Sequence, residues 1–454
     1  MLNIEIFNMT GIDTTNIDFD KSYTSFDTNT HNIIIEIYLK KDNNIKCDQC
    51  SSNNVVVNGS KVTTVKTSTV ESKNAIARVH RRRYKCKVCG NHTFLEINPL
   101  RTDGHRISVQ KEIMILNALR DKTRTYLSVA NEFDVSSTYV TNLFDTKVSL
   151  NRLKLPEVMC VDEVYLKKLV NNGYCFVMYA PQWKKIIDFL DSRHKNDLID
   201  YFSKIPQEEK NNVKFVSMDL YDNYRDVIKK CFPKAKICAD PFHVVKQLSI
   251  CFKKIRIDTM KSFESLKHEG HNYYWLYKRF WKFLAKDINK LPDSYIKVSK
   301  SGNLMTKYQI IDNMLNLNPT LRLAYELKEE YRNFVATATI DTAEKELLDL
   351  ITKFKSAHIN DYDPFISIMQ NWKNEIINSF NKINGHKISN GPMERVNRDI
   401  KTLNDISFGA TNFTRMRNRI MFSINDGAPI LAYRKENKTR REGKSRGKYN
   451  KKQK

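Results

Sequence analysis

Three acidic residues of this 454-residue chain have the chemistry and the positions of metal ligands. Asp162 and Asp219 each follow an apolar run that predicts a buried strand, where an unpaired carboxylate is costly. Glu394 stands in the first turn of a helix that Gly391 and Pro392 are expected to begin. Carboxylate oxygens suit Mg²⁺ or Mn²⁺, and two such ions can activate a nucleophile and stabilise a leaving oxygen at phosphorus. Because carboxylates at strand ends are common, these three residues alone do not decide the chemistry.

Four of the nine cysteines form two Cys-x-x-Cys pairs, Cys47 with Cys50 and Cys86 with Cys89. Four thiolates satisfy a tetrahedral Zn²⁺ ion in a closed structural site, and β-branched sequence lies between the two pairs. The pattern predicts a zinc ribbon, because four unrelated free thiols seldom fall into two such pairs. The other five cysteines lie in apolar surroundings and are expected to be core residues.

A basic strand follows within the same region. Alternation along residues 76–84 places Arg78, His80 and Arg82 on one face. Such a face suits contacts to DNA phosphates, and a solvated basic strand without a partner is an equally good interpretation.

Residues 127–144 have the spacing of a helix-turn-helix motif. Ala130 permits close helix approach, and Ser136 or Ser137 caps the second helix. Asp134 stands where many such motifs have glycine, and aspartate tolerates the required conformation acceptably. The second helix would present four side chains to a DNA major groove, namely Thr138, Tyr139, Thr141 and Asn142. A plain helical hairpin is the alternative.

From Pro156 the sequence alternates between predicted strands and helices. Strands are expected at residues 158–161, 174–179, 186–190, 213–218 and 235–240, and helices at 196–205 and 224–232. This order describes a mixed α/β sheet. Residues 243–383 have helical periodicity with interleaved aromatic and charged residues. Most of these aromatic residues are expected in the core, and stacking on DNA is the less favoured interpretation.

The chain carries 76 Lys and Arg residues against 51 Asp and Glu, a net charge of +25. This balance favours a polyanionic partner, either nucleic acid or an anionic membrane surface, over a protein that is merely basic. No apolar run approaches the roughly 18 residues that span a bilayer, and the N-terminus lacks the layout of a signal peptide. We therefore expect no membrane segment and a cytoplasmic protein. After Ala428 a basic tail is expected to be disordered, and either to bind DNA non-specifically or to keep the protein soluble.

These motifs occur together, and the chain resembles the ISL3 family of bacterial insertion-sequence transposases. The resemblance covers nearly the whole chain except the first forty residues and the tail. The matching stretches are residues 161–163, 216–221, 231–235, 240–245 and 389–398, followed by Phe408-Gly409, Asn412-Phe413 and Arg419-Ile420. The resemblance implies a ribonuclease-H-like core with a DDE triad, formed by Asp162, Asp219 and Glu394. It also implies a zinc ribbon followed by a helix-turn-helix.

The expected architecture is therefore a multidomain α/β chain with an N-terminal zinc ribbon, a helix-turn-helix and a ribonuclease-H-like mixed α/β core that is interrupted by an all-helical insertion. The expected boundaries are an N-terminal segment at 1–40, the ribbon at 41–100, the helix-turn-helix at 101–152, the core at 153–250 and 385–427, the insertion at 251–384 and the tail at 428–454.

Asp240 and His243 form a D-x-x-H pattern that resembles one found after the second Asp in related insertion-bearing transposases. His243 would orient the scissile phosphate or strand, or it is an ordinary hydrogen-bonded histidine at a helix start. In a ribonuclease-H-like sheet the first and fourth strands are neighbours, so Asp219 is expected to be the metal ligand and Asp240 to lie at the edge of the site. Glu163 is not expected to be a ligand, because strand alternation directs it away from Asp162.

The resemblance implies a reaction without a covalent protein intermediate. Metal-activated water cleaves the end of the element to give a 3′-OH, which then attacks double-stranded target DNA. The ribbon and helix-turn-helix would recognise terminal inverted repeats, and joining two ends implies a homo-oligomer on DNA. Two alternatives remain open: a DNA-binding regulator without catalysis, and a ribonuclease-H-like nuclease that cuts branched DNA without strand transfer.

Overall fold

Two units make up the chain, one formed by residues 1–150 with 427–454 and the other by residues 151–426. The computed structural model describes residues 15–42, 44–68, 74–89, 93–101, 106–170, 173–264, 268–288, 291, 294–298, 304–383, 385–407 and 411–431. Most of the predicted basic tail and the Phe408-Gly409 motif lie outside these residues. No helix within the described ranges is long and apolar enough to cross a membrane.

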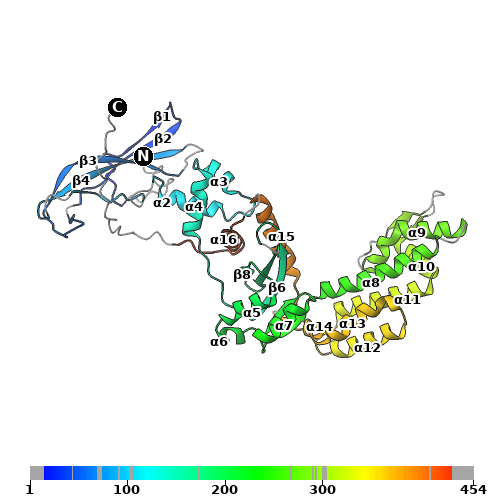
Figure 1. Ribbon diagram of the computed structural model, residues 1–454. Helices are drawn as coiled ribbons and strands as arrows, with labels where there is room; N and C mark the ends of the chain where they lie inside the picture. Colours follow the sequence, from blue (N-terminus) through cyan, green and yellow to red (C-terminus); the bar gives the residue numbers. More distant parts are fainter. Residues whose placement is uncertain are drawn as a thin grey trace, which may run out of the picture. The chain divides into compact units, whose positions relative to one another are not determined.

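The first unit contains a five-stranded sheet (Figure 1). Its strands are β1 (Tyr23–Asp27), β2 (Asn32–Tyr38), β3 (Val55–Lys66), β4 (Ala75–Cys86) and β5 (Thr93–Leu95). They lie in the order β1-β2-β4-β3, with β5 paired to β4. β2 is parallel to β4 and buries Ile35 and Ile37 against it. The first forty residues were expected as a separate segment, and their strands share this sheet with the cysteine-bearing strands.

The described part of the first unit also contains the helices α2 (Val109–Ala118), α3 (Tyr126–Glu132) and α4 (Ser137–Lys147). The Thr125 side chain accepts from the Ser128 N–H and so caps α3, and the Ser136 side chain accepts from the Tyr139 N–H and caps α4. Asp134, in the turn between them, has φ +48°, the left-handed conformation expected there. The Lys66 ammonium holds this turn through an ion pair of 2.9 Å with Asp134.

The second unit is built on a mixed sheet. Its strands are β6 (Val158–Tyr165), β7 (Tyr174–Ala180), β8 (Lys185–Leu190), β9 (Phe215–Met218) and β10 (Lys236–Ala239), in the order β10-β9-β6-β7-β8. β6, β7 and β8 form an antiparallel meander, and β9 and β10 extend it in parallel from β6. The first and fourth strands of the sheet are thus neighbours, as the resemblance to a ribonuclease-H-like sheet implied.

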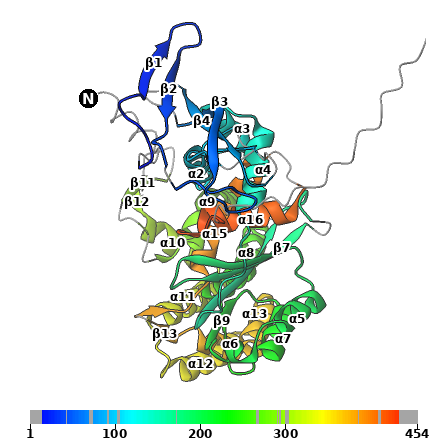
Figure 2. The ribbon, with the colours of Figure 1, turned by 90° about the vertical axis from the view of Figure 1, so that its left-hand side faces the viewer.

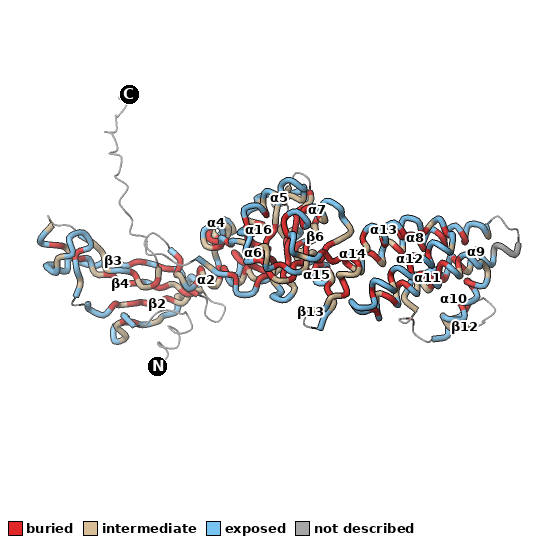
Figure 3. The backbone as a smooth tube through the Cα atoms, turned by 90° about the horizontal axis from the view of Figure 1, so that it is seen from below, coloured by how far each residue is buried: buried red, intermediate tan, exposed pale blue. Residues whose placement is uncertain are grey.

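Helices cover both faces of this sheet, and β6 lies buried between them (Figure 3). Helices α5 (Lys195–Ser203) and α7 (Asp222–Cys231) lie on one side, with the short α6 (Gln207–Asn211) after α5. Helices α15 (Gly391–Ile406) and α16 (Phe413–Ile424) lie on the other, against β6 and β8 (Figure 2). Since side chains alternate along a strand, Met159 and Val161 pack into the core with α5 and α7, while Cys160 and Asp162 face α15.

A group of helices lies between β10 and α15 in the sequence. It comprises α8 (Pro241–Ser262), α9 (His268–Ala285), α10 (Lys307–Asn316), α11 (Pro319–Thr337), α12 (Ala343–Ser356), the 3₁₀ turn η2 (Asn360–Tyr362), α13 (Asp363–Asn371) and α14 (Lys373–Asn378). The expected boundary at 250/251 falls inside α8, which runs unbroken from the end of β10 into this group (Figure 1).

The prediction of an all-helical segment is wrong in one respect, because two small antiparallel hairpins occur here. They are β11 (Tyr295–Lys297) with β12 (Leu304–Thr306), and β13 (Lys382–Ile383) with β14 (His386–Lys387). Each strand has at most three residues, which is too short to show a two-residue period in the sequence. The second hairpin leads directly to α15.

Candidate functional site

Asp162 lies within β6, which continues past the strand end expected at Val161, and Asp219 directly follows β9, the parallel neighbour of β6. The register pairs Cys160 of β6 with Ser217 of β9, and the two aspartates each stand two residues further along. Burial, and after it the negative charge of Asp219, raise the pKa of Asp162 to about 6.

Asp240 and His243 complete a cluster with Asp219. The His243 Nδ1 lies 3.0 Å from an oxygen of Asp219 and 2.8 Å from an oxygen of Asp240. Hydrogen bonds to Asp219 and then Asp240 raise the pKa of His243 to about 10, so the imidazole is a cation at neutral pH. Asp240 was expected at the edge of the site. It is 3% exposed and accepts a hydrogen bond of 3.0 Å from the backbone N–H of Asn390.

Helix α15 is joined to both aspartates by two asparagine side chains. Asn397 donates to the Asp162 carboxylate at 2.7 Å. Asn390 donates to the Val161 carbonyl at 2.9 Å and lies 3.4 Å from an oxygen of Asp219. Glu394 stands four residues after Asn390 and three before Asn397, so it shares their side of the helix. Glu394 is exposed, and within the described ranges it makes no ion pair.

These side chains fit a hard divalent cation. Carboxylate oxygens are the ligands that such a cation prefers, and the ligand atoms of Asp219, Asp240 and His243 all lie within 4.8 Å of one another. The side-chain amide oxygens of Asn390 and Asn397 are also buried without a hydrogen-bond partner among the described residues. Such orphaned oxygens are costly unless a cation or its bound water completes them.

Glu163 is directed away from this cluster, to the other face of the sheet. Its carboxylate accepts from the Arg193 guanidinium at 2.6 Å and from the Tyr224 hydroxyl at 2.9 Å. The guanidinium also lies 3.7 Å from the centre of the Tyr174 ring. Two adjacent carboxylates of β6 therefore have opposite surroundings, one paired with a cation and the other facing a second carboxylate.

The four paired cysteines converge at one end of β3 and β4. Cys47 Sγ lies 3.5 Å from Cys89 Sγ, and Cys50 Sγ lies 3.7 Å from Cys86 Sγ. All four sulfur atoms lie within 4.8 Å of one another. Backbone N–H groups of Cys89 and Val88 lower the pKa of Cys86 to about 6, whereas burial and the neighbouring thiols raise the pKa of Cys89. The cluster could hold a zinc ion.

The residues of β4 that were predicted to contact DNA phosphates, Arg78, His80 and Arg82, each lie beside a carboxylate. Arg78 Nη1 lies 3.1 Å and His80 Nε2 2.9 Å from oxygens of Glu36. Arg82 pairs with Glu96 at 3.0 Å and donates to the Leu39 carbonyl at 2.8 Å. Arg82 is therefore mainly a link between strands, and Arg78, about half exposed, is the freer of the two arginines.

The four residues predicted on the second helix of the motif differ in their freedom. Thr138 and Asn142 are exposed on α4. Thr141 is half-buried and its hydroxyl donates to the Ser137 carbonyl at 2.9 Å. The Tyr139 hydroxyl bonds the Glu112 carboxylate of α2. The helix thus presents two exposed polar side chains, and Tyr139 joins it to α2.

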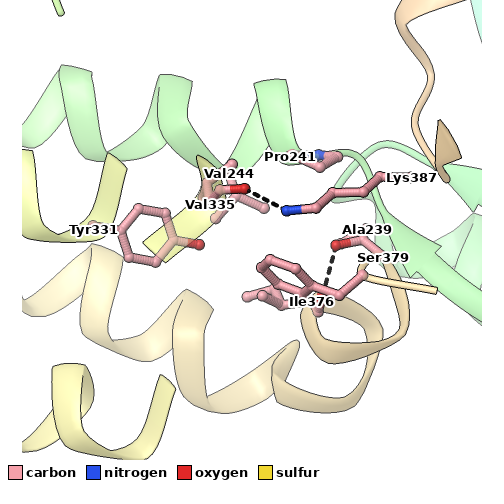
Figure 4. A pocket seen from close by; sticks show the side chains of 9 residues that line it. Ala239, Pro241, Val244, Tyr331, Val335, Ile376, Ser379 and Lys387 are labelled. Carbon is pink, nitrogen blue, oxygen red and sulfur yellow. Dashed lines mark hydrogen bonds between the residues drawn. The ribbon is translucent and has the colours of Figure 1, made fainter. Parts of the chain in front are cut away.

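A cavity of about 190 Å³ adjoins Asp240 on the side of the helical group (Figure 4). Ala239 and Pro241 line it, together with Tyr331, whose buried hydroxyl has no partner among the described residues. Lys387 also lines it, and donates to the Val335 carbonyl near the end of α11 at 2.9 Å. Because Asp162, Asp219 and Glu394 do not line it, the cavity is separate from the carboxylate cluster.

Sequence reasoning missed the contacts of Asn390 and Asn397. The available signal was their spacing of four and three residues from Glu394 on one predicted helix, since residues so spaced share a face. Neither asparagine belongs to the apolar stripe of α15, which is formed by Met393, Val396, Ile400 and Leu403.

The sequence model of a transposase family, the ISL3 type, matches residues 159–420 of the chain. The matched segment runs from β6 to α16 and so includes every residue of the carboxylate cluster. A comparison with curated proteins gives no match. The family match covers more than half of the chain, and the chain therefore belongs to the ISL3 family of transposases.

Proposed function

We propose that this chain cleaves the ends of an insertion sequence to 3′-OH groups and joins them to target DNA, with Asp162, Asp219 and Glu394 as ligands of Mg²⁺ or Mn²⁺. One observation carries the proposal. The helix that bears Glu394 is hydrogen-bonded to Asp162 through Asn397, and approaches Asp219 through Asn390. These two contacts support the assignment of three carboxylates from distant parts of the sequence to one site. The family match supports DNA as the substrate.

A ribonuclease-H-like core is supported by the strand order. The meander β6-β7-β8, extended in parallel by β9 and β10, makes the first and fourth strands neighbours. We infer that the helices between β10 and α15 are an insertion into this core. The chain leaves the sheet at Asp240, after β10, and comes back to the same place at Asn390, whose backbone N–H donates to Asp240.

Bound Mg²⁺ or Mn²⁺ would supply Lewis acidity and an activated water at the scissile phosphate. The chain positions the reactants. Asp162 is oriented by Asn397, and His243, fixed through Nδ1, offers its other ring nitrogen to a substrate phosphate. Water adds to phosphorus as the bond to the 3′ oxygen breaks, which leaves a 3′-OH and a 5′-phosphate. The 3′-OH then attacks a target phosphodiester, whose own 3′ oxygen departs.

The first unit is proposed to recognise the terminal inverted repeats. Four cysteines with mutually close sulfur atoms support a zinc ribbon, and the capped α3–α4 pair with Asp134 in its turn supports a helix-turn-helix. Thr138 and Asn142 are the side chains of α4 best placed to reach base edges, because both are exposed. Joining two ends at once implies a homo-oligomer on DNA.

The test uses the full chain, a duplex carrying the terminal repeat, and Mn²⁺. Asp219→Asn is expected to abolish cleavage while DNA binding survives, since the change removes charge and not fold. Asp240→Asn is expected to slow cleavage about 10–100-fold, because Asp240 holds His243 and α15 in place. Cleavage by Asp219→Asn beside an inactive Asp240→Asn would show that the triad is wrongly assigned. Binding without any cleavage by the unaltered chain would favour a regulator, and cutting of branched DNA without strand transfer would favour a nuclease.

A further inference from the structure

The basic charge of the helical group is concentrated in two of its helices. α8 contains five lysine and arginine residues, Lys246, Lys253, Lys254, Arg256 and Lys261, against the single acidic residue Asp258. The second basic helix is α9, whose described side chains include Lys278, Arg279 and Lys282. The three helices that follow it, α10, α11 and α12, each carry as many acidic as basic residues. A helical group that served only as a spacer would have no reason to separate charge in this way.

The lysines of α8 form an exposed row that starts beside the carboxylate cluster. Lys246 follows His243 by three residues, and Lys253 and Lys261 lie on the same side of the helix, seven and fifteen residues further on. At about 1.5 Å per residue the row is about 22 Å long. That length corresponds to roughly six or seven base pairs of duplex DNA, at about 3.4 Å per pair.

Helix α9 continues this pattern with exposed aromatic side chains. Trp275, Lys278 and Lys282 share one side of the helix, and Trp275 is 41% exposed. Trp281, 38% exposed, lies under the guanidinium of Arg256 from α8, 5.5 Å from its ring centre. Exposed lysines next to exposed aromatic rings suit the phosphates and sugars of DNA. Figure 1 shows α8 leading from the sheet to α9.

We propose that the exposed rows of α8 and α9, defined by Lys246, Lys253, Lys261, Trp275, Lys278 and Lys282, form a second DNA-binding surface that holds the duplex flanking the scissile phosphate. The charge complementarity is specific to these two helices. The contacts are to the DNA backbone and do not select sequence. The inference rests on the proposed function only in that the substrate is duplex DNA.

The test compares two triple variants with the same loss of charge. Lys253→Gln/Lys261→Gln/Lys282→Gln removes three lysines of the surface. Lys345→Gln/Lys353→Gln/Lys355→Gln removes three exposed lysines of α12, where charges are balanced. Binding to a duplex of arbitrary sequence is measured by fluorescence anisotropy from about 50 to about 200 mM salt. This assay measures DNA binding and not cleavage, so its result can be interpreted even if the proposed catalytic function is wrong.

Each lost phosphate contact should reduce the salt dependence of log K by about 0.9, so the first variant should lose roughly 2.7 in slope and the second almost nothing. Equal losses would show a long-range effect of net charge and overturn the proposal, as would an unchanged slope in both. Equal thermal unfolding midpoints for the two variants exclude misfolding. Duplexes extended on one side or the other of the cleavage point then identify the flank that the surface holds, and no gain of affinity on either side would also overturn it.

Discussion

Replacing Asp162 with asparagine should make the metal-free protein more stable at neutral and alkaline pH. Burial and the charge of Asp219 raise the pKa of Asp162 from its ordinary 3.8 to about 6. The difference of about two pKa units corresponds to about 3 kcal/mol, at about 1.36 kcal/mol per unit. This is the free energy that ionised Asp162 costs the folded state, and Asp162→Asn removes it.

The sign of the pH dependence follows from proton uptake. Between about pH 4 and pH 6 the folded state retains a proton on Asp162 that the unfolded state has lost, so stability falls as the pH rises. Above about pH 6 the loss is complete and constant. Asp162→Asn should therefore gain stability over the unaltered chain as the pH rises, by about 1.4 kcal/mol between pH 5 and pH 8. The Asn397 amide can turn its unpartnered oxygen toward the new side chain, so the contact survives.

The assay is denaturant unfolding at pH 5 and pH 8 in buffer without Mg²⁺ or Mn²⁺. Glu163→Gln is the matched control, because it removes the neighbouring carboxylate of the same strand. Glu163 is paired with Arg193 and Tyr224, so this variant should lose stability, by about 1–3 kcal/mol. If Asp162→Asn destabilises the chain as much as Glu163→Gln does, or if its effect is the same at both pH values, the account of the carboxylate cluster is wrong.

Three further expectations concern the same sites. His243 should stay protonated at pH 8 in the metal-free protein, because its pKa is raised to about 10. Its contribution to folding stability is then complete below about pH 6.5 and is lost only as the pH passes about 10. An imidazole NMR titration with a midpoint below 7 would contradict this. Cys86→Ser should release zinc and disorder the ends of β3 and β4, as measured by elemental analysis and amide exchange; a fresh preparation without zinc refutes the ribbon. Asn397→Ala should lower the rate of cleavage about 10–100-fold and raise the Mn²⁺ concentration needed, whereas a purely structural role would change thermal stability and leave the metal requirement unaltered.

The elements that the sequence predicted best are those determined by local interactions. The Ser136 cap of α4, and the left-handed Asp134 that precedes it, depend on residues within one turn of each other. The neighbouring positions of Asp162 and Asp219 were expected from the resemblance to a ribonuclease-H-like sheet, in which the first and fourth strands are neighbours, and β6 pairs with β9.

The features that could not be predicted depend on contacts between distant residues. The parallel pairing of β2 with β4 joins residues 33–38 to residues 75–80, and no local pattern specifies that partner. The burial of Asp240 depends on the backbone of Asn390, 150 residues away in the sequence. The role of Arg82 changed for the same reason, because Glu96 and the Leu39 carbonyl occupy its guanidinium.

The division of the chain has a consequence for its synthesis. The first unit is closed by the segment that follows α16: Arg120 donates to the Ala428 carbonyl at 2.7 Å, and the Leu431 N–H donates to the Lys147 carbonyl at 2.8 Å. These bonds cannot form until residues 151–426 have left the ribosome. At about 5–20 residues per second that interval lasts on the order of 14–55 seconds. In a nascent chain the cysteine cluster and the capped helices therefore lack these two hydrogen bonds for the whole time that the carboxylate-bearing unit is being made.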